Sequence, residues 1–304
     1  MNKLVFIFLF VMFSAMGLAF ATSDLQASIL RIATYNLWNP IFEEKYSGQN
    51  TWNERLPFIL ENILSSESDV ICLEEVGKNA YRDLIQNSDI NSHYTSFYVS
   101  HASSKQGQEE GRDGIACFYK SKKVTLMKLV QSPDGSRPTH RRDFYVDLKL
   151  NEQRETPVHF RIACTHLDSE KDLTIGNTQL SALVEDVLKV DNEKGLDFIV
   201  VCGDFNEGED ELLRPRYEIM HNAGFFTDGS VKATRPEALD VRHKGHVDWI
   251  YFKKLSTLNF DLISLAPIGD EKGSDHKLTL TDVKVTTSLQ NADHGVFFGK
   301  LSNN

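Results

Sequence analysis

The stretch IVVCGDFNEG, residues 199–208, joins the end of an apolar strand to a polar turn. Residues 199–202 are continuously apolar, as expected of a central strand that is covered on both faces. Asp204 and Asn206 then follow, so a carboxylate and a carboxamide stand where the strand emerges. Because side chains alternate along a strand, Cys202, Asp204 and Asn206 are expected to point to the same face.

Strands with polar ends recur along the whole chain. Ten short segments are rich in Val, Ile, Phe and Tyr and are separated by turn residues; they cover residues 29–36, 69–76, 95–100, 114–120, 124–130, 144–150, 158–167, 196–206, 247–253 and 276–286. Six of them begin or end with Asn, Asp, Glu or His, and these side chains are Asn36, Glu74, Glu75, His166, Asp168, Asp204, Asn206, Asp248, Asp275 and His276. Clefts in α/β sheets commonly form at strand ends, so we expect these polar groups to converge on one rim.

Helical periodicity appears in three segments between the strands. They are ERLPFILENILSS (54–66), TQLSALVEDVLKV (178–190) and DELLRPRYEIMHNAGF (210–225), the last interrupted at Pro215 and stopped by Gly224. Many strands with few helices predict one mixed α/β domain, in which two sheets pack together and the helices lie outside.

The cysteines all lie inside apolar, strand-like runs, at Cys72, Cys117, Cys164 and Cys202. This placement favours small buried residues over a disulfide-rich scaffold. Cys164 and Cys202 each stand two residues before a polar end group, on two strands that the second helical segment separates. A strand, a helix and a second strand in this order predict a parallel neighbour pair. We therefore expect Cys164 and Cys202 to lie close together beneath the rim as packed thiols, with a disulfide between them as the alternative.

The first residues are typical of a targeting segment. Lys3 precedes an apolar run at 4–20 that ends in the small-x-small pattern Ala19-Phe20-Ala21. This predicts a signal peptide over residues 1–21 and a secreted or periplasmic protein. An uncleaved membrane anchor is the alternative, because the run approaches the length of a membrane span. A single domain at 24–290 and a C-terminal tail at 291–304 are expected to follow, with no stable membrane insertion after cleavage.

The chain is acidic, with 33 basic and 43 acidic residues and a formal net charge of −10. Such a protein has no general electrostatic attraction for polyanions. A phosphate ester substrate would therefore need a metal ion or local cations.

The residue types at the strand ends indicate hydrolytic chemistry. Carboxylate and carboxamide oxygens suit Mg²⁺, with Mn²⁺ as the alternative, and histidines titrate near neutral pH. The sequence contains no Cys/His zinc motif, Gly-rich phosphate loop or G-x-S-x-G nucleophile. A metal ion, histidine and carboxylate together can hydrolyse a phosphate ester with water.

Six motifs in this order, TYNLW, CLEEV, THL, GDFN, VDWIYF and SDH, resemble the endonuclease/exonuclease/phosphatase superfamily. Each motif is weak alone, but the ordered set spans nearly the whole chain after the signal peptide. His166 makes the resemblance nearer to the deoxyribonuclease I, sphingomyelinase and deadenylase branches than to the exonuclease III branch. The resemblance implies a deoxyribonuclease I-like four-layer α/β sandwich, with two packed mixed β-sheets flanked by helices. It also implies Mg²⁺-dependent phosphoester hydrolysis.

The resemblance assigns metal binding to Asn36, Glu75 and Asp275. In LEEV the family pattern selects Glu75, whereas Glu74 is interpreted as an exposed acid at a strand end. Arg142 would bind the substrate, with Arg141 as its competitor.

The resemblance assigns catalytic roles to five further residues. Asp204 would orient the attacking water or bind a second metal, and Asn206 would hydrogen-bond a phosphate oxygen. Asp248 would fix the imidazole of His276, which would act as the general base or contact the phosphate. His166 would lie on the leaving-group side, and Glu109 and Glu110 are candidate partners for it.

Two departures from the family pattern concern substrate specificity. His246 stands where many relatives have Arg, and the segment GNTQL (176–180) stands where relatives often have Arg opening a helix. We expect a secreted, monomeric, Mg²⁺-dependent phosphodiesterase with nucleic acid as the favoured substrate. The alternatives are a sphingomyelinase-like phospholipid hydrolase, an inositol-phosphate phosphatase, and a non-catalytic binding module on the same fold.

Overall fold

The structure is a computed structural model of the 304-residue chain. It describes residues 27–40, 51–101, 113–131, 143–152, 156–169, 173–189, 195–207, 215–227, 247–264, 267–268 and 272–286. The predicted signal peptide, the C-terminal tail and Arg142 lie outside these ranges. All described residues fall within the predicted domain at 24–290.

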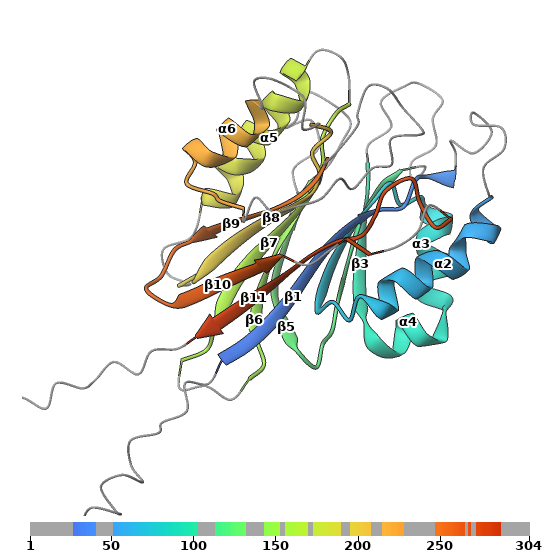
Figure 1. The fold of residues 1–304 in the computed structure, drawn as a ribbon, viewed down its shortest axis with the longest axis horizontal. Helices are drawn as coiled ribbons and strands as arrows, with labels where there is room; N and C mark the ends of the chain where they lie inside the picture. The colour runs from blue at the N-terminus through green and yellow to red at the C-terminus, as the bar shows by residue number, and fades with distance from the viewer. Residues whose placement is uncertain are drawn as a thin grey trace, which may run out of the picture.

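Two sheets lie face to face at the centre of the molecule (Figure 1). The six-stranded sheet, called sheet A, has the order β10-β11-β1-β2-β4-β3. Its strands are β10 (Asn259–Ser264), β11 (Thr279–Thr286), β1 (Ala27–Asn36), β2 (Val70–Glu74), β4 (Gly114–Tyr119) and β3 (Thr95–Ser100). Sheet A is mixed, because β1 pairs in parallel with β2 and antiparallel with β11.

The five-stranded sheet, called sheet B, has the order β5-β6-β7-β8-β9. Its strands are β5 (Val124–Gln131), β6 (Phe144–Leu150), β7 (His159–His166), β8 (Phe198–Asp204) and β9 (Asp248–Lys254). The predicted parallel pair is confirmed, because β7 and β8 run in parallel with Cys164 beside Cys202 and His166 beside Asp204.

Helices cover the outer face of each sheet (Figure 1). Sheet A is covered by α2 (Trp52–Ser65), α3 (Lys78–Gln86) and α4 (Ser88–His93), and sheet B by α5 (Leu173–Leu188) and α6 (Pro215–Asn222). A capping box of Thr51 and Glu54 starts α2, and Ile59 and Ile63 bury its inner face. The predicted four-layer sandwich is therefore confirmed.

Four elements differ from the sequence prediction. The helices α3 and α4 and the strand β10 were not predicted. Pro215 begins α6 instead of interrupting a helix, because proline lacks the N–H that the first helical position leaves unpaired and has a suitable φ.

The core between the two sheets contains all four cysteines, each fully buried. Cys72 of β2 forms a disulfide with Cys164 of β7, with a Cα–Cα distance of 5.7 Å. The prediction of a thiol at Cys164 is therefore wrong. Its parallel neighbour Cys202 remains a thiol, with its Sγ 3.2 Å from the Sγ of Cys72. The sequence could not show this pairing, because the bridge joins the two sheets and not two neighbouring strands.

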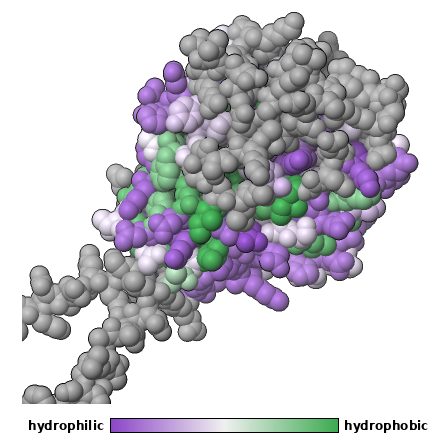
Figure 2. Space-filling model, in the orientation of Figure 1, coloured by the Kyte–Doolittle hydropathy of each residue, from purple (hydrophilic) through white to green (hydrophobic). Residues whose placement is uncertain are grey.

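The described surface in the view of Figure 2 is mainly hydrophilic, with separate hydrophobic patches. On the outer face of sheet A, Ile29 is 49% and Ile263 is 44% exposed. Arg31 and Asp282, on strands β1 and β11, form an ion pair on the same sheet at 2.7 Å, so these apolar side chains adjoin polar ones. Among the described residues, no helix is long and apolar enough to cross a bilayer.

Gly203 is required where β8 passes the backbone of β7. Its φ is +146°, and a Cβ added there would overlap the carbonyl of Thr165. We expect Gly203→Ala to lower the free energy of unfolding by about 3 kcal/mol, measured by urea denaturation. The matched control is Gly195→Ala, where φ is +53° but nothing lies within 4 Å of the added Cβ; its backbone strain should cost only about 1 kcal/mol. An equal loss from both substitutions would contradict the steric role of Gly203.

Candidate active site

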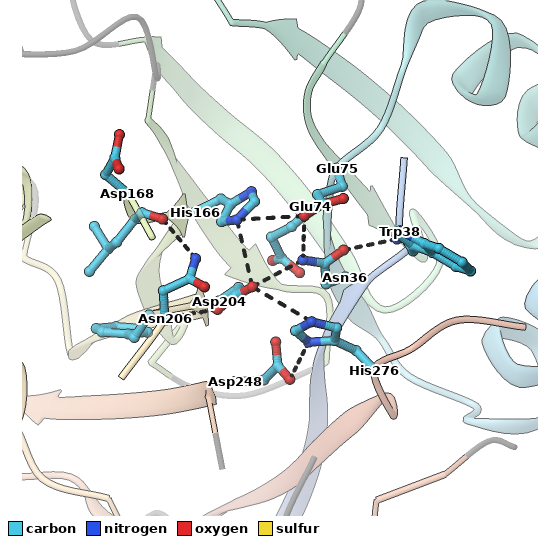
Figure 3. A network of polar contacts seen from close by, with 12 residues as sticks. Asn36, Trp38, Glu74, Glu75, His166, Asp168, Asp204, Asn206, Asp248 and His276 are labelled. Carbon is cyan, nitrogen blue, oxygen red and sulfur yellow. Dashed lines mark hydrogen bonds and ion pairs between the residues drawn. The ribbon is translucent and has the colours of Figure 1, made fainter. Parts of the chain in front are cut away.

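Polar side chains from both sheets meet at one rim of the sandwich (Figure 3). The strands β1, β2, β7 and β8 all end at this rim, while β9 begins there with Asp248. The structure brings together the predicted residues Asn36, Glu75, His166, Asp204, Asn206, Asp248, Asp275 and His276. All of them are less than one tenth exposed except Glu75, whose side chain is 17% exposed.

The carboxylate of Asp204 lies at the centre of the rim. The amide nitrogen of Asn36 donates a hydrogen bond to its Oδ2 at 3.0 Å. The Nε2 atoms of His166 and His276 lie 3.6 Å and 3.9 Å from the same oxygen. Its other oxygen, Oδ1, accepts a hydrogen bond from the backbone N–H of Asn206 at 2.8 Å. One carboxylate oxygen therefore faces two imidazoles that come from different sheets (Figure 3).

His276 is paired with Asp248, as the sequence predicted. The Nδ1 of His276 lies 2.9 Å from Oδ2 of Asp248, and both side chains are buried. Burial alone would lower the pKa of His276, but the carboxylates of Asp248, Asp275 and Asp204 raise it to about 10. In the metal-free protein at neutral pH, the imidazole of His276 is therefore a cation.

Asn36 connects the carboxylates of the two sheets. Its amide nitrogen donates to Glu75 Oε1 at 3.2 Å as well as to Asp204, and its amide oxygen accepts the backbone N–H of Trp38 at 2.9 Å. Glu75 also accepts a hydrogen bond from the backbone N–H of Asn39 at 2.9 Å. These contacts fix the orientation of Glu75, and the assignment of Asn36 as a metal ligand stays a prediction.

Glu74 does not lie on the surface, so its interpretation as an exposed acid is wrong. The side chain is 0% exposed and accepts a hydrogen bond from the hydroxyl of Thr34 at 2.7 Å. Burial, together with the nearby charges of Asp248 and Asp204, raises the pKa of Glu74 well above its usual range. The strand alternation explains the result, because Glu74 is the last residue of β2 and points into the interior while Glu75 has left the strand.

Backbone strain gathers at the rim. Four described residues other than glycine have a positive φ, and three of them, Trp38, Glu75 and Asn206, belong to this site with φ values of 52°, 56° and 49°. Such conformations cost energy and persist where the surrounding structure enforces them, commonly at functional sites. The polar ends of β1, β2 and β8 each turn sharply at these residues.

Asp275 and Asn206 also belong to the rim. Asp275 precedes His276, and its Oδ1 lies 4.0 Å from the Nε2 of that imidazole. The amide nitrogen of Asn206 donates to the carbonyl of Leu167 at 2.9 Å, which connects the ends of β7 and β8.

Two buried arginines support the loops of the rim, and sequence reasoning missed both. The guanidinium of Arg55, on α2, donates to the carbonyls of Leu37 and Trp38, each at 2.8 Å, and of Gly273 at 3.0 Å. The only signal in the sequence is a charged residue on the apolar face of a predicted helix. Arg55 therefore fixes the loop after β1 against the loop that carries His276.

Arg216, on α6, supports loops next to sheet B as Arg55 does next to sheet A. Its guanidinium donates to the carbonyls of Phe205 and, at 3.0 Å, of Asp168. A Cβ at Gly176 would overlap this guanidinium, so the glycine in GNTQL makes room for an arginine from another helix. Arg216 thus holds the loops that follow β7 and β8.

Several residues that the sequence predicts for the site lie outside the described part of the chain. The substrate-binding candidate Arg142 and its competitor Arg141 lie outside the described residues, as do His246, Glu109 and Glu110. Among the described residues, His101 and Asp113 lie close to His166, and no motif in the sequence singles them out.

The donor set at the rim fits a divalent cation. Six carboxyl groups surround two imidazoles: those of Glu74, Glu75, Asp113, Asp204, Asp248 and Asp275. Burial and then the charges of Asp113 and Asp275 raise the pKa of Glu75 to about 7, and burial also raises the pKa of Asp204. Buried carboxylates that repel one another are stabilised when a cation neutralises them. Their oxygens are the ligands that Mg²⁺ prefers.

Magnesium binding is expected to weaken as the pH falls below about 7. Since the pKa of Glu75 is about 7, a proton competes with the cation below this pH, whereas the carboxylate is already ionised above it. The apparent affinity should fall about tenfold per pH unit below pH 7 and level off above it. Titration calorimetry with Mg²⁺ across this range measures the effect. Glu75→Gln, which cannot ionise, should bind weakly at every pH; an affinity of the unaltered protein that does not change with pH would contradict the assignment.

Comparisons with known proteins find a matching family and several similar proteins. A sequence profile described as the Endonuclease/Exonuclease/phosphatase family matches residues 33–276. The chain is similar to the CCR4-Not complex 3'-5'-exoribonuclease subunit Ccr4 of Mycosarcoma maydis, with 31% identity over 80 residues, or 25% of this chain and 12% of the relative. It is also similar to Nocturnin of Drosophila melanogaster, with 26% identity over 208 residues, or 62% of this chain and 29% of the relative. The matches thus span less than a third of either relative.

Solved structures share the fold. The crystal structure of ANGEL2, a 2',3'-cyclic phosphatase in complex with adenosine-2',3'-vanadate, superposes with a TM-score of 0.65 at 19% sequence identity. The superposition covers 85% of this chain and 96% of that chain. At this level of identity the likeness concerns the four-layer architecture alone.

Proposed function

Because the chain belongs to the Endonuclease/Exonuclease/phosphatase family, we propose that it is a metal-dependent phosphoester hydrolase whose reaction takes place at the rim around Asp204. One observation carries the proposal. Oδ2 of Asp204 lies within 4 Å of an imidazole from each side, and one of these imidazoles is hydrogen-bonded to a buried carboxylate. The arrangement supplies groups that can position water and transfer protons on both sides of a phosphate.

Glu75 and Asp275 would hold the divalent cation, with Asn36 beside them. The cation, Mg²⁺ or alternatively Mn²⁺, would neutralise charge on a phosphate oxygen and on the leaving group. Asn36 and Asn39 orient Glu75 through hydrogen bonds, and such supporting contacts commonly determine metal affinity.

The described side chains divide the remaining tasks. Asp248 holds the imidazole of His276 in one orientation, and the charged form of His276 binds a phosphate oxygen. Asp204 accepts a hydrogen bond from the attacking water and orients it toward phosphorus. His166, whose Nε2 faces Asp204 and Glu75, donates a proton to the leaving oxygen.

We propose nucleic acid, and RNA in particular, as the substrate class. The relative Ccr4 is named as an exoribonuclease, and the ANGEL2 structure contains an adenosine-2',3'-vanadate. The first name refers to the cleavage of RNA, and the second protein is named a 2',3'-cyclic phosphatase and is in complex with a vanadate ester of adenosine. The substrate test must decide between nucleic acid and two alternatives, a phospholipid and an inositol phosphate.

We also propose that the protein is exported. The disulfide between Cys72 and Cys164 supports this, because disulfides persist mainly in oxidising compartments. The segment 1–21 supports it independently, through its basic residue, apolar run and small-x-small ending. Mass determination of the secreted protein tests the expected cleavage after Ala21.

Hydrolysis of bis-p-nitrophenyl phosphate tests the catalytic proposal. The purified protein should release p-nitrophenol with Mg²⁺, and EDTA should abolish the activity until Mg²⁺ is restored. A panel of oligoribonucleotides, 2',3'-cyclic nucleotides, sphingomyelin and inositol phosphates then identifies the substrate class. If the unaltered protein and Asp204→Asn are equally inactive on every member of the panel, the hydrolase proposal is wrong.

A further inference from the structure

A second group of potential ligands includes His166 but not His276. One ring nitrogen each of His101 and His166 and one carboxylate oxygen of Asp113 all lie within 4.8 Å of one another. The two histidines are only 4% and 2% exposed. From this geometry we propose that His101, Asp113 and His166 form a second cation site, distinct from the carboxylate centre around Glu75.

The fold prepares two of the three ligands on one hairpin. His101 directly follows β3 and Asp113 directly precedes β4, which pairs with β3 in an antiparallel ladder. The backbone N–H of His101 donates to the carbonyl of Asp113 at 2.9 Å, so the two residues are held opposite each other. His166 ends β7 of the other sheet. A cation at this point would therefore be held by both sheets.

The carboxylate of Asp113 is already oriented by neighbouring donors. Its Oδ1 accepts hydrogen bonds from the backbone N–H of Gly114 at 2.8 Å and from the amide of Asn39 at 3.3 Å. Because both bonds are to Oδ1, we assign Oδ2 to the cation. Metal-binding carboxylates are commonly supported by such outer contacts. The backbone N–H of Asn39 also donates to Glu75, so this one residue connects the two sites.

The ligand types differ from those of the carboxylate centre and select a different cation. Two imidazoles with one carboxylate suit Zn²⁺, Mn²⁺ or Fe²⁺, whereas oxygen ligands alone favour Mg²⁺. Ligands of a tetrahedral zinc ion lie about 2.1 Å from the metal and therefore about 3.4 Å apart. Since the three ligand atoms lie within 4.8 Å of one another, they need to approach by at most about 1.4 Å, which side-chain rotation can supply. We assign the site to a borderline transition-metal cation such as Zn²⁺.

The site would act on His166. Its Nε2 lies 3.6 Å from Asp204 and 3.9 Å from Glu75 (Figure 3), so the ring borders both centres. Coordination through one ring nitrogen fixes the ring and keeps the proton on the other nitrogen, which is then the one proposed to serve the leaving oxygen. It also places positive charge beside an acidic rim that must receive an anion. His101 and Asp113 would then be positioning residues for His166.

Cobalt binding tests the site without any measurement of hydrolysis. Bound metal is removed from the full protein with a chelator, without reducing the Cys72–Cys164 disulfide. The protein is then titrated with Co²⁺, because the visible absorption of Co²⁺ reports low-symmetry coordination by nitrogen ligands. The unaltered protein should develop this absorption, and Zn²⁺ should displace it. His101→Ala should weaken Co²⁺ binding by more than about 100-fold, and Asp113→Asn should weaken it in the same direction.

The matched control is Glu75→Gln, which removes a charge from the carboxylate centre but none of the three proposed ligands, and which should keep the cobalt absorption. His101→Gln, which preserves the size and polarity of the side chain, replaces His101→Ala if circular dichroism shows that the alanine variant is unfolded. The proposal is overturned if the His101 variant binds Co²⁺ like the unaltered protein, or if only Glu75→Gln loses the absorption. Because binding is measured directly, these outcomes are independent of whether the proposed phosphoester hydrolysis is found.

Discussion

Substitution His276→Ala is expected to lower the rate of phosphoester hydrolysis by about 10²- to 10⁴-fold. In the proposed mechanism, the side chain contributes both the positive charge that meets the phosphate and the contact with Asp248. Initial rates on bis-p-nitrophenyl phosphate at saturating Mg²⁺ measure the loss. Urea denaturation should show that the alanine variant is still folded, so that the lost rate reports chemistry and not stability.

Asp248→Asn is the matched variant for this experiment. The carboxamide keeps the size of the side chain and can keep a hydrogen bond to Nδ1 of His276, but it removes the charge that raises the pKa of the imidazole. The double variant with His276→Ala should be no slower than His276→Ala alone, because the two residues act as a unit. Full additivity of the two losses would show that Asp248 acts independently of His276 and would contradict the dyad.

Loss of the Cys72–Cys164 disulfide is expected to lower the free energy of unfolding by about 4 to 5 kcal/mol. The bridge closes a loop over a sequence separation of 92 residues, and the chain-entropy estimate for a loop of that length gives this magnitude. Urea denaturation of Cys72→Ala against the unaltered protein measures it. Cys117→Ala is the control, since Cys117 is equally buried and is the β4 partner of Cys72 but forms no bridge.

Cys164→Ala should be less damaging than Cys72→Ala. With Cys164 removed, Cys202 can bridge to Cys72, because the Sγ atoms of these two residues are already 3.2 Å apart. Peptide mapping by mass spectrometry should find this new bridge in oxidised Cys164→Ala. Equal stability of Cys72→Ala and Cys117→Ala would mean that the cross-link between the sheets contributes nothing to folding.

The sequence predicts the architecture correctly wherever the buried apolar residues form a clear pattern. The apolar run before Asp204 and the helical segment before it predicted that β7 and β8 are parallel neighbours, and the register beside Cys202 agrees. The convergence of Asn36, Asp204 and His276 was predicted because strand ends of packed sheets meet at one rim. Short elements such as α4 have too few residues for a periodic signal, so they were missed.

Features of the structure that depend on contacts between elements distant in the sequence could not be predicted. The partner of Cys164 lies in the other sheet, so spacing along the chain does not reveal it. Glu74 looks like a surface acid, because adjacent glutamates at a strand end are usually solvated. Its burial follows only once Glu74 is known to be the last residue of β2 and Glu75 to have left the strand. Arg55 is charged but fully enclosed, because its partners are backbone carbonyls of loops that approach it in space.

The hydrogen bonds of the rim join residues that are very far apart in the chain. The bond from Asn36 to Asp204 spans 168 positions and the bond from Ser274 to the carbonyl of Asn36 spans 238, while β1 pairs with β11. Contacts between such distant residues form late in folding, because their loop-closure entropy must be overcome first. We therefore expect the proposed activity to appear only once folding is complete. A partly folded chain would contain helices and strands but would lack the assembled rim around Asp204.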